Sequence, residues 1–284
     1  MTDPNIREID DPAARPAGPP AERQEGEDWK SYLWFLAKLV IVVLLFRTFV
    51  FTSFNIPSES MMPRLLVGDY LFAAKWPYGY SRYSLPGDID VGDGRLFNTL
   101  PERGDVVIFK HPIDHTDYIK RVIGLPGDKV QMINGVLNIN DQPVGMERVE
   151  DFVLPLREDG RCFSGRFVEA AANGGYACRY PQFRETLPNG VEHNILDLVP
   201  DGDVDDTAPV IVPDGYLFMM GDNRDNSQDS RRPSVAGGWV GLVPQENLVA
   251  RASFMYWSTD GSAEWLLPWT WFTAARWSRI GRGI

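Results

Sequence analysis

The sequence predicts a mainly β fold: an antiparallel-sheet domain with a β-rich insertion, preceded by one N-terminal transmembrane helix. An apolar run near the N-terminus predicts the helix, and short runs of β-branched and aromatic residues after it predict the strands. A long stretch of acids, glycines and prolines interrupts these runs and predicts the insertion. We therefore expect an N-terminal tail (1–28), a transmembrane helix (29–53) and a β domain in two pieces (54–142 and 210–260). An insertion (143–209) separates the two pieces, and a second tail (261–284) follows.

The first segment, residues 1–28, carries five prolines, eight acidic residues and three arginines, with almost no aliphatic bulk. Such a composition cannot bury enough apolar area to offset the entropy lost on ordering. We expect a disordered tail.

The apolar run LWFLAKLVIVVLLFRTFVFTSF spans residues 33–54. A helix of about 22 residues is roughly 33 Å long, which matches the hydrocarbon core of a bilayer. Lys38 and Arg47 leave only 39–46 unbroken, but each lies near one end and can extend its charge to the interface. Two alternatives are a cleaved signal peptide, which the acidic tail and the lack of a small-x-small site before Pro57 oppose, and a buried core helix.

Strands are expected at GDVVIFKHP, DYIKRVIGLPGD, YLFMMGDN and LVARASFMYW, because β-branched and aromatic residues alternate there between Gly, Pro and Asp. The segment VQMINGVLNIN predicts a hairpin with Asn134 and Gly135 in a type I′ turn. Residues 143–209 are expected to form a loop-rich insertion with a few strands.

The insertion holds both cysteines of the chain, Cys162 and Cys178. They are either two unrelated buried thiols or a disulfide, which would close a loop of about 15 residues and contribute about 3 kcal/mol. The last segment, EWLLPWTWFTAARWSRIGRGI, interleaves four tryptophans with three arginines. This composition is typical of a membrane interface, and an ordinary core strand with a basic tail is the alternative.

Net charge and motifs exclude several functions. A formal charge of −11 and a pI near 4.8 oppose nucleic-acid binding, which needs a clustered basic surface. Of the three histidines, His111 and His115 have helical metal spacing, but Pro112 lies in a strand-like context and no HExxH motif follows. We expect His193 and these two to hold no metal, and no phosphate-binding loop or cofactor motif is present in the sequence.

A serine and a lysine remain as candidates for chemistry. A lysine acts as a general base only when neutral, and an exposed one is neutral about 0.1% of the time near pH 7.5. Strand alternation places Lys120 on the face of Tyr118 and Val122, where burial would lower its pKa. The alternatives are a solvated lysine and, for Ser60, an ordinary turn hydroxyl.

Ser60 and Lys120 belong to a set of four short sequence blocks. They are PSESMMP (57–63), RGDVVIFKHP (103–112), KRVIGLPGD (120–128) and GDNRDNSQDSR (221–231). Together, after a single apolar run, they resemble bacterial type I signal peptidase, the leader peptidase family, over residues 30–131 and 212–260. The resemblance implies a hydrolase: a serine endopeptidase that works with a serine/lysine dyad.

The resemblance also implies roles for individual residues. Ser60 matches the nucleophile, Lys120 the general base, and Ser58 the hydroxyl that joins the Ser60 backbone N–H in an oxyanion hole. Ser227 matches the residue that orients the lysine amine.

Two ion pairs are implied as supports, one between Asp229 and Arg231 and one between Arg121 and Asp222. One position departs from the family: a small residue is usual where Glu59 stands. A carboxylate there is tolerable if it points to solvent, but otherwise it would oppose an oxyanion and favour the protonated lysine.

The implied substrates are preproteins, whose signal peptides bind as an added β-strand and are cut after a small-x-small pattern. The candidate pocket lining is apolar, with ordinary core packing as the alternative, and consists of Phe54, Ile56, Leu65, Ile108 and Ile119. The expected location is the bacterial cytoplasmic membrane, with the tail inside and the catalytic domain on the outer, periplasmic face. The expected partners are signal peptides, phospholipid and, as a further candidate, the secretion translocon. The rival functions are a self-cleaving repressor-type protease and a membrane-anchored scaffold without catalysis.

Overall fold

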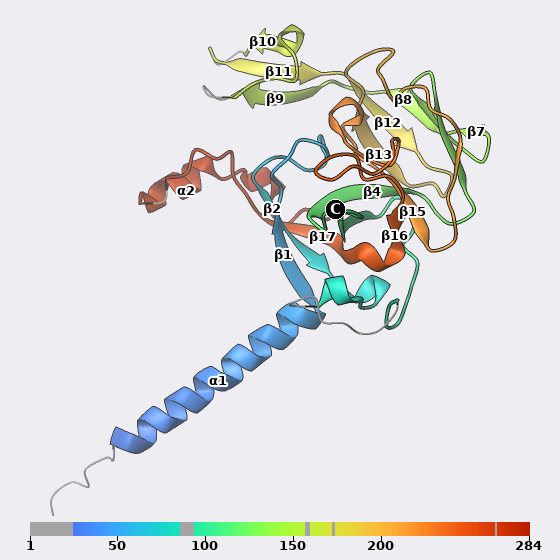
Figure 1. Ribbon diagram of the computed structural model, residues 1–284. Coiled ribbons are helices and arrows are strands. Elements are labelled where there is room, and N and C mark those ends of the chain that lie inside the picture. Colours follow the sequence, from blue (N-terminus) through green and yellow to red (C-terminus); the bar gives the residue numbers. More distant parts are fainter. Residues whose placement is uncertain (1–24, 86–93, 157–159, 172–173, 265) are drawn as a thin grey trace, which may run out of the picture. The chain divides into compact units, whose positions relative to one another are not determined.

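The computed structural model describes residues 25–85, 94–156, 160–171, 174–264 and 266–284 (Figure 1). The chain divides after Leu44 into two compact units, of which the second holds all the strands. Residues 1–24 of the predicted tail lie outside the described residues, and 25–28 already belong to the first helix.

Helix α1 runs from Glu25 to Phe49. Its segment Trp29–Phe49 is 21 residues long with a hydropathy of 1.9, and none of its most apolar window is buried, unlike the helix of a protein core. By length and composition it can cross a membrane. The predicted span of 29–53 is too long at its C-terminal end, because strand β1 (Phe51–Asn55) starts there and pairs with β2 along its whole length.

The main sheet has seven strands in the order β1-β2-β17-β3-β4-β15-β16, and every neighbouring pair is antiparallel. Beyond β1, its strands are β2 Asp69–Ala74, β3 Val106–Lys110, β4 Asp117–Gly124, β15 Tyr216–Met220, β16 Val243–Pro244 and β17 Leu248–Ser258. The four strand runs predicted from sequence are β3, β4, β15 and β17. The mainly antiparallel β fold after one apolar helix is therefore confirmed.

A four-stranded sheet in the order β14-β5-β6-β7 extends this domain. Its strands are β5 Lys129–Ile133, β6 Val136–Ile139, β7 Gln142–Pro143 and β14 Val210–Ile211. The predicted hairpin joins β5 to β6, and both turn residues have positive φ, 47° for Asn134 and 75° for Gly135, as a type I′ turn requires.

The insertion, which we predicted to be β-rich, with loops and a few strands over 143–209, is organised in sheets. It forms two antiparallel three-stranded sheets, β10-β11-β9 and β13-β12-β8. Their strands are β8 Gly145–Arg148, β9 Phe152–Leu156, β10 Val168–Ala170, β11 Tyr176–Tyr180, β12 Gln182–Thr186 and β13 Glu192–Leu196. The sequence conceals these strands because their burial does not follow a clean alternation. Cys162 and Cys178 are joined in a disulfide.

The C-terminal segment is not a core strand. It contains the short helix α2 (Pro268–Ala274), and its end returns to β17 through a bridge between Phe254 and Gly283. Three of its tryptophans are exposed to solvent, by 65%, 38% and 56% for Trp269, Trp271 and Trp277. Its role at a membrane is a prediction that we take up below.

Candidate active site

The loop between β1 and β2, residues 56–68, carries Ser60 and is called the serine loop here. Its apolar side chains anchor it, because Ile56, Met61 and Leu65 are fully buried in the main core cluster. The Met62 amide donates to the Glu59 carbonyl at 3.0 Å, which closes a tight turn. The turn holds Ser60 at the protein interior, only 7% exposed.

Lys120 reaches Ser60 from β4. It is 3% exposed, and its Nζ donates to Ser60 Oγ at 2.7 Å and to the Ile119 carbonyl at 3.1 Å. The Tyr118 ring, on the same face of the strand as predicted, lies 5.7 Å from the amine. The structure thus brings together the two residues that the sequence singled out.

Burial lowers the pKa of Lys120 to about 8, because a charged amine loses its hydration there. The carboxylates of Asp229 and Asp222 oppose this shift, and the Arg231 guanidinium adds to it. At pH 7.5 an amine with such a pKa is neutral roughly a quarter of the time. A neutral amine within hydrogen-bond reach of a hydroxyl can accept its proton.

Groups that could stabilise an oxyanion lie beside Ser60 Oγ. Ser58 Oγ is 3.3 Å from it, and within the described residues the Ser60 backbone N–H donates to no other group. A backbone N–H and a hydroxyl next to an attacking oxygen are the kind of donors that acyl-transfer sites use.

The predicted ion pair between Asp229 and Arg231 is present and fully buried, with Arg231 Nε 2.8 Å from Asp229 Oδ1. Burial would raise the pKa of Asp229, but the Arg231 charge and its hydrogen bonds hold that pKa below its ordinary value. Ser227 is buried nearby, and its hydroxyl lies close enough to Asp229 to help lower the pKa of that carboxyl. Its predicted role in orienting the Lys120 amine stays a prediction.

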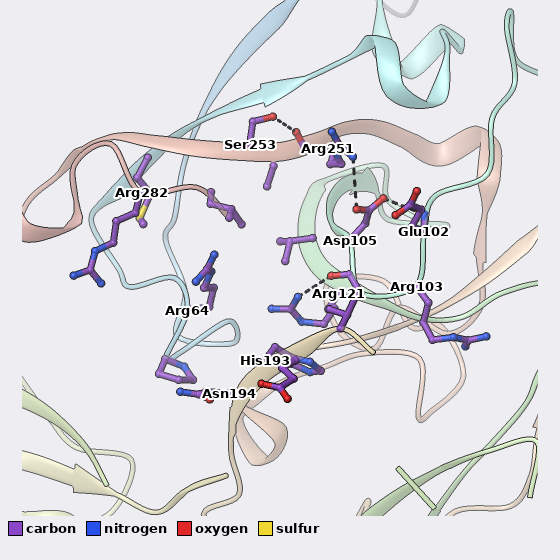
Figure 2. A pocket seen from close by; sticks show the side chains of 18 of the residues that line it. Arg64, Glu102, Arg103, Asp105, Arg121, His193, Asn194, Arg251, Ser253 and Arg282 are labelled. Atoms are coloured by element: carbon purple, nitrogen blue, oxygen red, sulfur yellow. Dashed lines mark hydrogen bonds and ion pairs between the residues drawn. The ribbon is translucent and has the colours of Figure 1, made fainter. Parts of the chain in front are cut away.

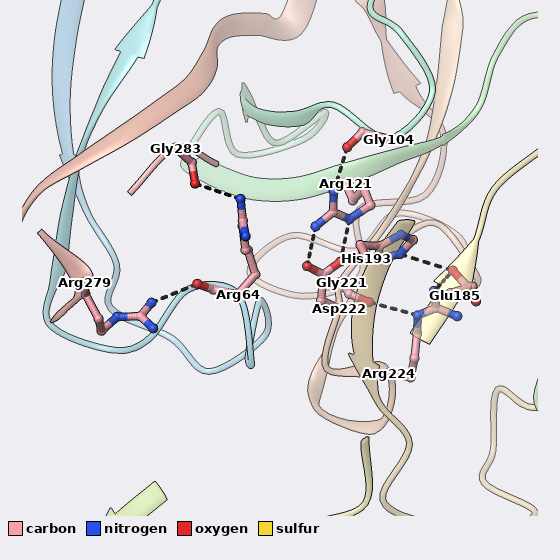
Figure 3. A network of polar contacts seen from close by, with 10 residues as sticks. All are labelled: Arg64, Gly104, Arg121, Glu185, His193, Gly221, Asp222, Arg224, Arg279 and Gly283. Carbon is pink, nitrogen blue, oxygen red and sulfur yellow. Dashed lines mark hydrogen bonds and ion pairs between the residues drawn. The ribbon is translucent and has the colours of Figure 1, made fainter. Parts of the chain in front are cut away.

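Arg121 points to the other face of β4 and forms the second predicted ion pair. It meets Asp222 through two parallel bonds of 2.8 and 2.6 Å and also donates to the Gly104 carbonyl at 2.7 Å. Figure 3 shows this pair beside a second one, in which Arg224 donates to Glu185 of the insertion at 2.6 Å. These pairs tie β4, the segment after β15 and the insertion into one network.

Known proteins resemble this chain over most of its length. A family model described as "Signal peptidase, peptidase S26" matches residues 29–257. The chain belongs to the signal peptidase family. Relatives named "Signal peptidase I" occur in Rickettsia bellii (strain OSU 85-389), 39% identical over 242 residues that cover 82% of this chain and 73% of that protein, and in Rickettsia canadensis (strain McKiel), 38% identical and covering 82% and 80%. A solved signal peptidase I from Enterococcus faecalis V583 is 21% identical and covers 54% of this chain and 97% of that one, with a TM-score of 0.28.

The resemblance to type I signal peptidase is therefore confirmed, and this signal peptidase is a hydrolase. Its apolar helix α1 is consistent with a membrane anchor.

Sequence reasoning missed how the signal peptidase holds its serine loop. Gly221, after β15, leaves no room for a side chain, since a Cβ there would lie 2.3 Å from Ser227 Oγ and 2.5 Å from the Ser60 carbonyl. The Asn223 amide donates to the same carbonyl at 3.1 Å, and its side chain donates to the Glu59 carbonyl. All three contacts are made by residues of the block GDNRDNSQDSR. The resemblance of this block to the family was the only sequence signal that could have pointed to them.

Glu59, the departure from the family pattern, is half-buried rather than in solvent. Asn226 Nδ2 donates to its carboxylate at 2.9 Å, and burial raises the pKa of this carboxyl. The carboxylate is therefore held by Asn226, and its effect on the protonation of Lys120 stays a prediction.

Ser60 and Lys120 open into a cleft of about 910 Å³. The insertion supplies part of its wall through Phe163, Val199 and Val204, and Trp239 supplies another part. No histidine lines this cleft within the described ranges. His111 is fully buried, 3.2 Å from the Trp239 carbonyl, so it contacts the back of the wall rather than the cleft.

The predicted substrate-pocket residues divide into two groups. Ile119 lines the cleft. Ile56, Leu65 and Ile108 are at most 2% exposed in the core cluster, against which Phe54 packs. Their part in substrate binding stays a prediction.

One group of three carboxylates among the described residues is close enough to share a cation, and it consists of Asp197, Asp205 and Asp225. Burial, together with the charges of the other two, raises the pKa of Asp197 to about 6. Asp225 already accepts bonds from the backbone amides of Leu198 and Val199. We assign the group the structural task of joining the insertion to the segment after β15.

Proposed function

We propose that this signal peptidase removes N-terminal signal peptides from preproteins, with Ser60 as nucleophile and Lys120 as general base. The observation that carries the proposal is the 2.7 Å contact between Lys120 Nζ and Ser60 Oγ, both buried at the edge of an open cleft. Holding an amine there at a pKa near 8 has a cost in stability that a structural lysine would avoid.

The geometry supports a two-step hydrolysis. Lys120 takes the proton of Ser60 as Oγ attacks the scissile carbonyl carbon, and the new oxyanion accepts bonds from the Ser60 N–H and the Ser58 hydroxyl. The protonated amine then gives its proton to the leaving amine, which departs with the mature protein. A water, deprotonated by Lys120, attacks the acyl-serine, and the amine then returns this proton to Ser60 Oγ as the signal peptide is released.

Substrate selection follows from an extended peptide lying in the cleft. A peptide paired as an added strand presents alternate side chains to the wall, so its first and third residues before the cut would contact the same side. Small apolar pockets discriminate by only about 1–3 kcal/mol per methylene. Extended backbone pairing and placement at the membrane must therefore add to fidelity.

The membrane is the expected place of action. Helix α1 is apolar over 21 residues, and Ser60 follows its last residue, Phe49, by only 11 positions in the sequence. A signal peptide emerges on the outer face of the bacterial cytoplasmic membrane, so we place the N-terminal tail inside and the catalytic domain on the periplasmic side. The translocon that delivers the substrate stays a predicted partner.

An aromatic surface in the second unit supports membrane contact. Phe51, Phe72 and Phe254 lie on one face of neighbouring strands, with ring centroids 5.4–6.1 Å apart. Trp76, which is 49% exposed, packs on Phe51 at 5.0 Å. We call Phe51, Phe72, Trp76 and Phe254 the aromatic surface.

Cleavage of a preprotein by the detergent-solubilised full chain tests the dyad. Ser60→Ala and Lys120→Ala should each lower kcat by at least about a thousandfold, because neither partner can complete proton transfer alone. Replacing all three histidines should leave the peptidase active. Full activity in either dyad variant would contradict the mechanism and favour a structural role for the four blocks, whereas loss of activity without the histidines would favour a histidine base.

A further inference from the structure

A second cavity, of about 820 Å³, lies on the opposite side of β4 from the catalytic cleft. Lys120 lines the cleft and Arg121, the next residue of the strand, lines this cavity. The two sites share no lining residue. Figure 2 shows Arg64 and Arg121 reaching toward the middle of the cavity from two sides, with Arg251 on β17.

Arginines dominate the walls of this cavity. Six of them line it, against three acidic residues, Glu102, Asp105 and Glu192. The arginines are Arg64, Arg103, Arg121, Arg251, Arg279 and Arg282. Arg103, Arg121 and Arg279 are neutralised by Asp128, Asp222 and Asp69, at 2.8, 2.6 and 2.5 Å respectively.

The other three lack a close carboxylate partner. Arg64 donates only to the Gly283 carbonyl, at 2.7 Å, and Arg251 lies 3.9 Å from the nearest oxygen of Asp105. The Arg282 guanidinium has no hydrogen bond or ion pair to any described residue, although its backbone is fixed to β17 through the Met255 amide.

The Arg64 guanidinium is repelled by Arg282 and by the paired arginines Arg121 and Arg279. Burial lowers the pKa of Arg64, and the charges of Arg121, Arg279 and Arg282 lower it further, opposed by Asp222. His193 borders the same cavity, and its buried Nδ1 has no partner among the described residues, while Nε2 lies 3.2 Å from Glu185. An anion in this cavity would relieve the repulsion and meet several unused donors.

We propose that this cavity binds the phosphate group of a membrane phospholipid. A phosphate offers several oxygens to guanidinium forks, so a cavity lined by several arginines suits it better than it suits a single carboxylate. The assignment to a lipid rests on the proposed membrane placement. Along β17, Arg251 and Ser253 of the cavity precede Phe254 of the aromatic surface in the sequence, and in the C-terminal segment Arg279 and Arg282 follow the exposed Trp277. Aromatic residues beside basic ones are typical of a headgroup interface.

The cavity does not depend on the family resemblance. Arg279 and Arg282 lie beyond residue 257, where the match to the family model ends. The C-terminal segment brings them to the cavity by pairing with β17, through the bridge of Gly283 to Phe254 and the bond from the Ile284 amide to the Ser253 carbonyl at 2.9 Å.

Calorimetric titration of the full-length protein in neutral detergent tests the proposal. The probe is the short-chain lipid dihexanoyl phosphatidylglycerol, compared with inorganic phosphate and with an acidic peptide. Arg64→Gln and Arg282→Gln should each weaken binding of the lipid at least about tenfold. The matched control is Arg179→Gln, which removes one charge from an exposed strand of the insertion and should change binding less than about twofold.

Each other outcome contradicts part of the proposal. Inorganic phosphate bound as tightly as the lipid would overturn the assignment to a headgroup, and tighter binding of the acidic peptide would replace the lipid with a protein partner. Undiminished lipid binding in both arginine variants would overturn the site itself, provided that their thermal unfolding matches the parent. Ser60→Ala should bind the lipid normally, so failure of the peptidase mechanism would leave this result unchanged.

Discussion

At the scale of single residues, strand β4 contributes one side chain to the catalytic cleft and the next side chain to the second cavity. Lys120 and Arg121 are neighbours on β4 and point to opposite faces. Lys120 is buried near carboxylates that already have partners, since Asp229 pairs with Arg231 and Asp222 pairs with Arg121. Because those carboxylates are neutralised, they oppose the effect of burial only in part, and the pKa of Lys120 stays near 8.

The first residue-scale prediction concerns pH. The pKa of Lys120 lies below its ordinary value of 10.5, at about 8, and only the neutral amine is a base. We therefore expect kcat/KM for a preprotein to rise about tenfold per pH unit below pH 8 and to level off above it. The measurement is the pH dependence of kcat/KM, which reports the pKa values of the free enzyme. The substrate should carry no titratable group near the cleavage site. A midpoint near 10.5, or a flat profile between pH 6 and 9, would contradict the assignment.

At the scale of elements, the insertion supports the serine loop. Met62 and Leu66 of the loop share a core cluster with Tyr180, Leu196 and Leu198 of the insertion. The disulfide between Cys162 and Cys178 belongs to the same cluster. Its neighbour Phe163, which donates its amide to the Tyr180 hydroxyl at 3.0 Å, forms part of the cleft wall. A segment outside the four blocks thus shapes both the loop and the cleft.

The prediction at this scale concerns the disulfide. Changing both cysteines to serine should lower the free energy of unfolding by about 3 kcal/mol, the entropy expected for a loop of this length. It should also lower kcat/KM several-fold, because the cluster that positions the serine loop would loosen. The measurements are denaturant unfolding and cleavage of a preprotein.

The parent protein after reduction is the matched control and should behave like the double variant. An unchanged unfolding midpoint together with unchanged kinetics would show that the insertion is independent of the serine loop.

At the scale of the whole molecule, two regions expose large apolar side chains to solvent. Helix α1 and the aromatic surface both present large hydrophobic side chains to solvent, which a soluble monomer rarely does. The negative net charge of −11 disfavours binding to an anionic membrane in general, so contact must come from such local patches.

The prediction at this scale uses proteoliposomes that contain the full chain and a preprotein in the same bilayer. Phe254→Glu and Trp76→Glu should each lower cleavage about tenfold, because a charge at the interface is costly to bury. Ile211→Glu is the control, since Ile211 is 69% exposed on β14 outside the aromatic surface and should change cleavage less than about twofold. Equal losses in all three variants would contradict a membrane contact at the aromatic surface.

The sequence by itself determined the apolar helix, four of the seven strands of the main sheet and the Asn134–Gly135 hairpin, because these depend on local periodicity and turn residues. It paired Ser60 with Lys120 only through the resemblance of four short blocks to a known family. Only the tertiary structure decided how Gly221 and Asn223 contact the serine loop and how Asn226 binds the Glu59 carboxylate. It also decided how the insertion folds and which arginines line the second cavity. Those features join residues far apart in the chain. Such contacts form only when the whole sheet is assembled, so no local pattern records them.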